Sequence, residues 1–368
     1  MKVTIERAQL AKSLAHVHRV VERRNTIPIL ANVLLRASKS NVELKATDLD
    51  LEIVETAPGE GKQTGSTTVP AHMIYDIVRK LPEGAQVELQ SAADGTQLQV
   101  RAGRSKFTLQ ALPETDFPDL AAGEMTHSFS IASADLKRLI DRTQFAISTE
   151  ETRYYLNGIY LHAIDDKLRA VATDGHRLAQ AEIKAPKGTK GMPGVIIPRK
   201  TVTEVQRLID DAGDEVKIEL SATKIRFSLG NAVLTSKLID GTFPDYARVI
   251  PAANDKTLIV DKGEFMSAVD RVSTVSSERG RAVKLALTDG KLTLSVINPD
   301  SGSATEELEV EYGAEALDIG FNGRYLLDIL QQVEGEKARL KLADPGSPTL
   351  IEDMETAGAL YVLMPMRV

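Results

Sequence analysis

Hydrophobic and polar positions follow two different periods along this chain, and the two periods separate short strands from helices. Residues 2–6 alternate as a half-buried strand does, whereas Leu10, Leu14 and Val17 step by four and three residues, as one face of a helix does. Patterns of the second kind predict six helices, at residues 8–21, 71–81, 134–147, 199–209, 263–275 and 323–333. Short alternating segments and turn residues fill the rest. The chain is therefore expected to fold as an α+β protein in which antiparallel hairpins dominate.

The sequence also repeats itself at a spacing of 126 residues. Three matches share this spacing: Phe117-Pro118-Asp119 with Phe243-Pro244-Asp245, Thr47-Asp48 with Thr173-Asp174, and Leu112 with Leu238 and Met364. The period is that of a whole domain and not of a solenoid repeat. We predict three copies of one domain, at 1–122, 123–252 and 253–368, with linkers near 121–126 and 251–256. Each copy has two similar halves of strand, helix and strands, and three copies in line suggest an arc.

The polar faces of the predicted helices are basic. Lys12, His16 and Arg19 keep the spacing of the apolar positions but lie about 200° further round the helix, on its opposite face. Other predicted helices carry cations at Arg79, Lys80, Arg138, Arg142, Arg199, Lys200 and Arg207, and more weakly at Arg271 and Arg324. Such a row is either an ordinary solvated face or a surface that attracts a polyanion.

Composition limits the remaining possibilities. The chain has 368 residues and a net charge of −7, so any nucleic-acid surface must be a local concentration of cations. With no Trp and 4% aromatic residues, a stacking platform for single strands is poorly supported. The absence of Cys excludes disulfides and thiolate chemistry, and no segment resembles a signal peptide or a membrane span. We expect a cytoplasmic protein without a membrane partner.

Three segments resemble sites of chemistry. Asp174 and His176 could act as acid and base in a hydrolase or transferase, but no convincing nucleophile accompanies them, so a modified hairpin turn is the alternative. Residues 59–64 lack the glycine spacing of a phosphate-binding loop. His16 and His18 face different sides of a helix and cannot share a metal ion. We expect no catalytic residue, no cofactor and no metal.

The chain remains apolar to its last residue. Residues 360–368 read either as a buried final strand or as the edge of an apolar pocket, and the two can coexist if the strand ends at Leu363. Met364 and Met366 are flexible side chains suited to a surface that accepts several partners.

A set of motifs, in this order and spacing, resembles the bacterial DNA polymerase III β subunit family, the sliding clamps, along essentially the whole chain. These motifs are Arg24-Asn25-Thr26-Ile27-Pro28-Ile29-Leu30, Arg153-Tyr154-Tyr155-Leu156-Asn157-Gly158, Thr173-Asp174-Gly175-His176-Arg177-Leu178, Ile197-Pro198-Arg199-Lys200, Phe243-Pro244-Asp245-Tyr246, Gly320-Phe321-Asn322 and Met364-Pro365-Met366-Arg367. The resemblance implies three tandem clamp domains, each with two helices packed on antiparallel sheets, and a head-to-tail homodimeric ring of six such domains. The implied function is non-catalytic: the ring encircles double-stranded DNA without sequence specificity and confers processivity.

The resemblance also implies partners and residues. The expected partners are the catalytic subunit of DNA polymerase III, the clamp loader, and other polymerases and repair proteins that bind through short linear motifs. The implied peptide pocket comprises Arg153, Leu156, Thr173, Gly175, His176, Arg177, Leu178, Pro244, Arg248, Val249, Asn322, Tyr325, Val362, Met364, Pro365 and Met366. Together with the basic helix residues, it assigns DNA contacts to Arg24, Arg79, Arg138, Arg142, Tyr154, Tyr155, Arg199 and Lys200. Val368 and Ala247 depart from the family pattern at the pocket rim, where Leu and Arg are expected.

The size of the predicted domains agrees with a ring of two chains. A compact domain of ~122 residues is ~35 Å across, so six in a circle enclose a hole of ~35 Å and three only ~5 Å, against about 20 Å for a duplex. Closing such a ring needs apolar surface at both ends of the chain. Our candidates are Ile74, Phe107, Leu109, Val272 and Val275, each of which could instead be core. A protein-binding scaffold that does not act on DNA remains the alternative function.

Overall fold

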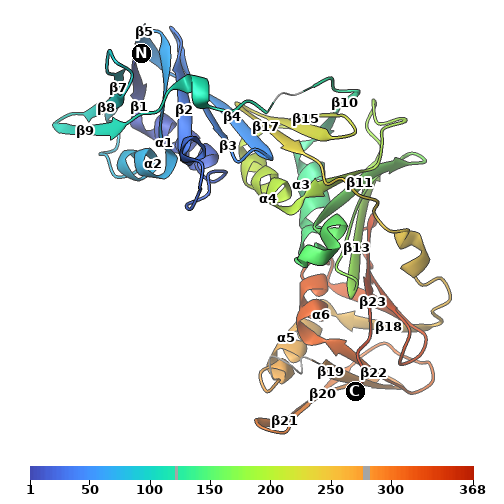
Figure 1. Ribbon diagram of the computed structural model, residues 1–368. Helices are drawn as coiled ribbons and strands as arrows, with labels where there is room; N and C mark the ends of the chain where they lie inside the picture. The colour runs from blue at the N-terminus through green and yellow to red at the C-terminus, as the bar shows by residue number, and fades with distance from the viewer. Residues whose placement is uncertain (121–122, 277–281) are drawn as a thin grey trace. The chain divides into compact units, whose positions relative to one another are not determined.

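The structure is a computed structural model that describes residues 1–120, 123–276 and 282–368 (Figure 1). The six predicted helices are all present: α1 (Arg7–Val17), α2 (Ala71–Val78), α3 (Ser133–Asp141), α4 (Arg199–Leu208), α5 (Lys262–Ser273) and α6 (Gly323–Leu330). Each ends earlier than its apolar pattern does. The reason is that the turns after the helices also bury apolar side chains: Val21, Leu81 and Val333 are only 3%, 6% and 1% exposed.

The described chain forms two compact units. Unit 1 contains residues 1–136, 186–189 and 203–238, and unit 2 contains residues 137–185, 190–202 and 239–368. The second predicted copy contributes to both units, and α3 and α4 each pass from one unit into the other. The first predicted linker, 121–126, begins at two residues that lie outside the described part of the chain. The second, 251–256, leads into β18 (Lys256–Asp261).

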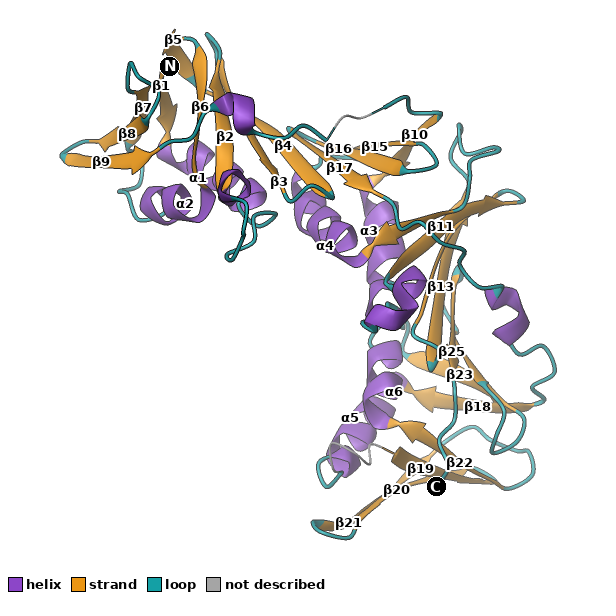
Figure 2. Cartoon of the chain, in the orientation of Figure 1, coloured by secondary structure: helices purple, strands orange, loops and turns teal. Residues whose placement is uncertain are grey.

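Unit 1 contains two antiparallel sheets, with α1 and α2 lying together on one side of the strands (Figure 2). The five-stranded sheet has the order β5 (Glu60–Gln63), β1 (Lys2–Glu6), β7 (Gln86–Ser91), β8 (Gln97–Ala102) and β9 (Ser105–Gln110). The eight-stranded sheet has the order β10 (His127–Ala132), β15 (Glu215–Leu220), β16 (Lys224–Leu229), β17 (Ala232–Lys237), β4 (Leu51–Pro58), β3 (Asn41–Thr47), β2 (Asn32–Ala37) and β6 (Gly65–Pro70). The pairing of β4 with β17 therefore joins the first copy to the second within one sheet.

Unit 2 repeats this plan with the second and third copies. Its eight-stranded sheet has the order β14 (Val195–Pro198), β11 (Gly158–Ile164), β12 (Lys167–Thr173), β13 (Arg177–Lys184), β25 (Ala359–Leu363), β24 (Thr349–Asp353), β23 (Lys337–Leu342) and β18. A four-stranded sheet follows in the order β21 (Gly302–Glu309), β20 (Lys291–Asn298), β19 (Ala282–Thr288) and β22 (Leu317–Asn322). Here β13 pairs with β25 and joins the second copy to the third.

Strand burial follows the alternation that the sequence predicts. In β20, for example, Leu292, Leu294 and Val296 are at most 2% exposed, and the residues between them face outward. One face of each such strand thus packs toward the helices and forms the core. In the described residues, no helix is long and apolar enough to cross a membrane.

Candidate functional site

The segment Thr173–Leu178 forms the tight turn between β12 and β13. Thr173 Oγ1 donates to the Arg177 carbonyl (2.7 Å) and accepts from the Gly175 amide (3.1 Å), while Asp174 Oδ1 accepts from the His176 and Arg177 amides (2.9 and 3.0 Å). The Asp174 carboxylate is therefore engaged in holding the turn. The geometry supports the hairpin interpretation over an acid and base pair, because hydrogen bonds to the backbone and to Arg177 Nε (3.1 Å) occupy this carboxylate.

Glycine is required at the tip of this turn. Gly175 has φ +88°, and a Cβ there would lie 2.5 Å from Nη1 of Arg153. Arg153 lies against the turn and also forms an ion pair with Glu150, whose pKa it lowers by hydrogen bonding to the carboxylate. The equivalent turn of the first copy has Leu49 at φ +78°, which is unusual for a residue with a side chain. The repeated Thr-Asp motif thus produces the same turn twice.

The end of the chain lies beside this turn. Arg177 and Leu178 pair with Leu363 and Val362, and beyond the strand the Met364 amide donates to the His176 carbonyl (2.9 Å). The Met366 amide then donates to the carbonyl of Gly320 on β22 (2.8 Å). The prediction of a buried final strand is confirmed, because Tyr361, Val362 and Leu363 of β25 are at most 2% exposed. Met364 and Val368 are 39% and 62% exposed, and the pocket edge stays a prediction.

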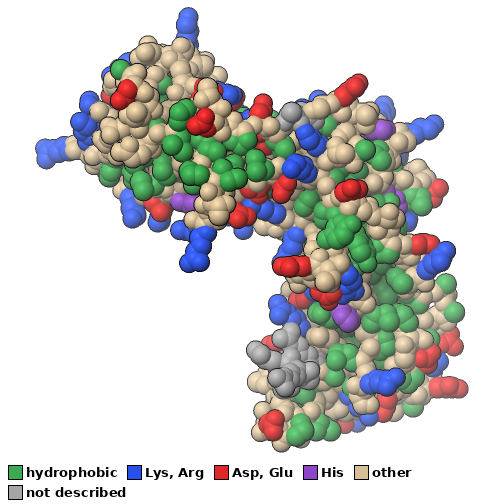
Figure 3. Space-filling view, in the orientation of Figure 1, with side chains coloured by type: hydrophobic (Ala, Val, Ile, Leu, Met, Phe, Trp, Pro, Cys, Tyr) green, Lys and Arg blue, Asp and Glu red, His purple; other side chains and the backbone are tan. Residues whose placement is uncertain are grey.

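An apolar cluster forms the floor below these residues. It consists of Leu156, Val171, Leu178, Ile196, Phe243, Tyr246, Leu350 and Val362, all at most 8% exposed. Tyr246 begins the short helix η6 (Tyr246–Val249). Two residues of this helix face solvent: Val249 is 48% exposed, and the side chain of Arg248 is 84% exposed. In Figure 3 hydrophobic side chains gather over the middle of unit 2. Exposed apolar residues above a buried apolar floor are typical of a surface that receives a few apolar anchors.

Arg177 connects the second copy to the third. Its guanidinium forms an ion pair with Asp328 of α6 (Nη1 to Oδ2, 2.6 Å) and donates to the Phe145 carbonyl (2.7 Å). It also lies 4.2 Å from the ring centroid of Tyr325 and 5.1 Å from that of Phe145. A polar cavity of about 470 Å³ borders these groups. Arg177 is thus held between two rings and fixes Tyr325 next to His176, with 6.4 Å between their ring centroids.

Asn322 has a structural part as well. Its side-chain oxygen accepts hydrogen bonds from the Arg324 and Tyr325 amides (3.0 and 3.3 Å) and caps the N-terminus of α6. The cap orients the first turn of the helix, on which Tyr325 lies.

The structure brings the sixteen predicted pocket residues together in unit 2, on five neighbouring segments. Sequence reasoning missed their supports, namely Phe145, Asp328, Leu350 and the rings of Phe243 and Tyr246. A signal existed for Phe243, because Phe-Pro-Asp is one of the repeated motifs. None existed for Asp328, which is one of many acidic residues on helices.

The predicted DNA contacts fall into accessible and buried groups. Arg24, Arg79, Arg199 and Tyr154 are exposed, and Arg138, Tyr155 and Lys200 are partly exposed. Arg142 is only 4% exposed and forms an ion pair with Glu334 (Nη2 to Oε1, 2.6 Å), so its prediction as a DNA contact is wrong. A charge that is covered and paired within the chain has no surface to offer a phosphate.

The candidates for the chain-to-chain interface also need correction. Ile74, Leu109 and Val272 are 0%, 4% and 2% exposed and belong to the core, as the alternative reading allowed. Phe107 on β9 is 37% exposed, and Val275 after α5 is partly exposed. Only these two of the five have surface available for a second chain.

Models of three domains of one protein family match almost the whole chain. They describe the N-terminal, central and C-terminal domains of the DNA polymerase III beta subunit and match residues 1–121, 130–245 and 247–367. The chain belongs to the DNA polymerase III β subunit family. Its function is accordingly that of a DNA sliding clamp, a processivity factor without catalytic activity.

Curated relatives and solved structures agree with this assignment over full length. The beta sliding clamp of Caulobacter vibrioides is 53% identical over 372 residues, with 100% of both chains covered, and that of Escherichia coli K12 is 40% identical over 370 residues, again with 100% of both covered. A Bartonella birtlesii sliding clamp bound to griselimycin superposes with a TM-score of 0.97 at 56% identity and covers 100% of both chains. A Caulobacter crescentus sliding clamp, with polyethylene glycol at a putative β-motif tethering region, gives 0.98 at 53% identity and covers 100% of this chain and 99% of its own.

Proposed function

We propose that two copies of this sliding clamp join head to tail into a closed ring around duplex DNA, and that its partners bind the surface around Gly175 and Met364. The observation that supports the proposed ring is the strand pairing by which each copy joins the next. In both units, the strand after the tight turn of one copy pairs antiparallel with the last strand of the following copy: β4 with β17, and β13 with β25.

By the same rule, one strand of the first copy and one strand of the third copy lack the second neighbour that their equivalents have. In the third copy the strand at this position is β21, an edge of the four-stranded sheet, and the last strand of the first copy is β9, an edge of the five-stranded sheet. Unpaired edges of this kind readily accept another strand. Pairing β21 with β9 of a second chain would repeat the internal junction and close the ring.

The charges of the two edges are complementary. The strand β21 carries Glu306, Glu307 and Glu309, whereas β9 carries Lys106 and is preceded by Arg104. Opposite charges steer association and suppress pairing of like edges. Phe107 borders a hollow of about 650 Å³ that also contains Met73, Ile77 and Leu81, and this hollow would receive apolar side chains from the second chain.

The accessible cations support non-specific attraction of DNA. Arg24, Arg79 and Arg199 are exposed long side chains that suit phosphate contacts, which carry no sequence information. Together with Arg138, Lys200 and the two tyrosines, they would line the hole at distances that water can bridge. Such binding is weak and fades with salt, and the closed ring, not affinity, keeps the protein on DNA.

The partners proposed for the Gly175–Met364 surface are the polymerase III catalytic subunit, the clamp loader, and other polymerases and repair proteins with short linear motifs. The support is the arrangement of exposed Met364 and Val249 over a buried apolar floor, next to His176. A relative whose structure is described as bound to griselimycin adds support, since the match covers the whole chain.

Small-angle X-ray scattering tests the ring before DNA is added. One chain has a mass of 40.0 kDa, so the expected particle has twice this mass and the distance distribution of a hollow ring. A particle with the mass of one chain that persists at high concentration would contradict the proposal, because one chain cannot enclose a duplex.

A further inference from the structure

A basic side chain stands at the same position in each copy, on the last turn of the first helix or directly after it. His16, Arg142 and Arg271 each lie six residues after the first buried apolar residue of that helix, which is Leu10, Leu136 or Phe265. The first two of these side chains lie at the junction with the following copy, and their contacts can be compared directly.

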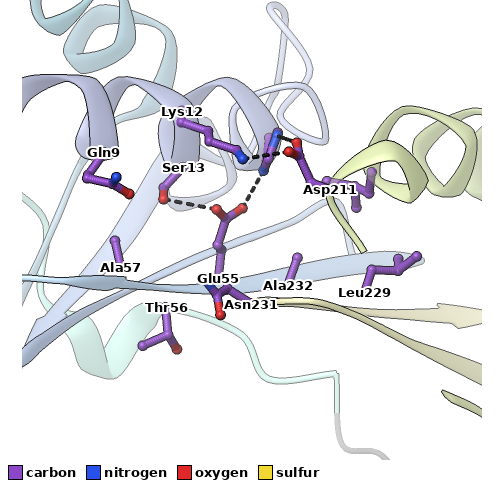
Figure 4. A pocket seen from close by; sticks show the side chains of 12 residues that line it. Gln9, Lys12, Ser13, Glu55, Thr56, Ala57, Asp211, Leu229, Asn231 and Ala232 are labelled. Carbon is purple, nitrogen blue, oxygen red and sulfur yellow. Dashed lines mark hydrogen bonds and ion pairs between the residues drawn. The ribbon is translucent and has the colours of Figure 1, made fainter. Parts of the chain in front are cut away.

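At the first junction, α1 of the first copy meets the end of the second copy's helix α4. The two nitrogens of His16 contact Glu55 Oε2 (2.7 Å) and Asp211 Oδ2 (3.2 Å), and Lys12 also contacts Asp211 (2.5 Å) (Figure 4). Ser13 donates to the other oxygen of Glu55 (3.0 Å). Glu55 belongs to the same copy as His16, whereas Asp211 belongs to the next copy. One basic side chain therefore joins an internal carboxylate to a carboxylate of the neighbour.

At the second junction, the equivalent cation is Arg142, and its ion pair with Glu334 again reaches into the following copy. No internal carboxylate is available, because Ala181 stands 126 residues after Glu55. Arg138, which corresponds to Lys12, donates to the carbonyl of Ala357 in the third copy (3.5 Å). The rule therefore holds at both internal junctions: a basic side chain of one copy contacts an acid of the next.

The acids of the following copies lie in corresponding turns. Asp211 and Glu334 follow the second helix of their copies, two residues before Gly213 and one residue before Gly335, in the turns that lead to β15 and β23. In the first copy the corresponding turn contains Glu83, which directly precedes Gly84 and lies three residues before β7. Glu83 is exposed, and within the described residues it has no ion-pair partner.

The third copy contains the basic side chain and the internal carboxylate, the counterparts of His16 and Glu55. Arg271 on α5 forms an ion pair with Glu306 of β21, with 3.0 Å between Nε and Oε2. Glu306 lies opposite Leu294 in the sheet, as Glu55 lies opposite Leu44, so the two carboxylates are equivalent. The Arg271 side chain is 59% exposed, so its guanidinium remains accessible beside Glu306.

We propose that Arg271 of one chain binds Glu83 of a second chain while it retains Glu306, and so completes at the ring-closing junction the ion pair found at both internal junctions. This inference rests on the proposed head-to-tail ring. A guanidinium has five donors in a planar fork and can serve two carboxylates at once. In the third copy the position equivalent to Lys12 and Arg138 is occupied by the uncharged Ser267. Of the two positions, only that of Arg271 therefore carries a positive charge in this copy.

Charge exchange tests the pair. Arg271→Glu and Glu83→Arg should each raise the dimer dissociation constant roughly 10- to 100-fold, because like charges then face each other across the junction. The double variant Arg271→Glu/Glu83→Arg restores opposite charges at both junctions of the dimer. If the two substitutions acted independently, their fold-increases in the dissociation constant would multiply. The dissociation constant of the double variant, measured by analytical ultracentrifugation, should be at least about tenfold lower than that product predicts.

Lys284→Glu is the matched control, since it makes the same charge change in the third copy on a partly exposed residue that pairs with Asp318 on the sheet. It should leave the dissociation constant within about twofold of the original. Two outcomes would overturn the inference but not the proposed ring. In the first, the fold-increases of the two single variants simply multiply in the double variant. In the second, Lys284→Glu raises the dissociation constant as much as Arg271→Glu does. A wild-type protein that remains monomeric at every concentration would overturn the ring and the inference together.

Discussion

Removal of Met364–Val368 is expected to weaken binding of a polymerase-derived motif peptide at least about 100-fold, with the fold retained. The strand β25 ends at Leu363, so the truncated chain keeps its complete pairing with β13 and β24. What it loses is the exposed Met364 side chain beside His176 and the segment that crosses to Gly320. A few apolar anchors supply most of the free energy of such a peptide contact.

Fluorescence anisotropy with a labelled peptide measures this loss, and a pair of point variants supplies the control. Met364 and Met354 are similarly exposed, at 39% and 37%, but Met354 follows β24 at the opposite end of the β24–β25 pair. Met364→Ala should weaken peptide binding, and Met354→Ala should leave it unchanged. Unchanged affinity in the truncated chain would show that the peptide binds elsewhere.

Replacement of Arg177 by Ala is expected to destabilise unit 2 by about 3–5 kcal/mol, since it leaves one side of a mostly buried ion pair without its partner. The Arg177 side chain is 10% exposed, and Asp174 and Asp328 are 15% and 27% exposed. Both carboxylates and the Phe145 carbonyl would lose a donor, and Tyr325 would lose the cation that lies over its ring.

Hydrogen exchange locates this effect. Amides of α6 and of the turn around Phe145 should exchange faster in Arg177→Ala, and the melting temperature should fall. Arg248→Ala removes the same kind of side chain from a position that is 84% exposed, and it should leave both unchanged. Equal protection of α6 in the two variants would mean that Arg177 does not hold the second and third copies together.

The sequence predicts those parts of the fold that depend on local pattern. The helices follow from apolar spacing, and the turn at Thr173–Leu178 follows from a motif that recurs at Thr47 with the same hydrogen bonds. The C-terminal segment could be divided into a buried strand and an exposed rim, because Leu363 is followed by two flexible methionines separated by Pro365. In each case the information lies within about ten residues of chain.

The sequence predictions that were wrong depended on which distant segment packs against a helix or strand face. Arg142 lies on the polar side of its helix pattern, but it is buried in the folded chain and pairs with Glu334, almost two hundred residues later. Ile74 and Val272 are apolar residues of the first and third copies, and periodicity alone cannot separate a core position from an interface position. The same limit hid Asp328 and Phe145, since a support is recognised only when its partner from another segment is placed beside it.

Retention on DNA of two topologies tests the central claim most directly. After an ATP-driven loader has placed the protein on a nicked circular duplex, it should remain bound at high salt and leave when a restriction enzyme cuts the circle, because a closed ring is held by topology and not by phosphate contacts. Equal loss from the circular and the linear duplex at high salt would contradict the sliding clamp account.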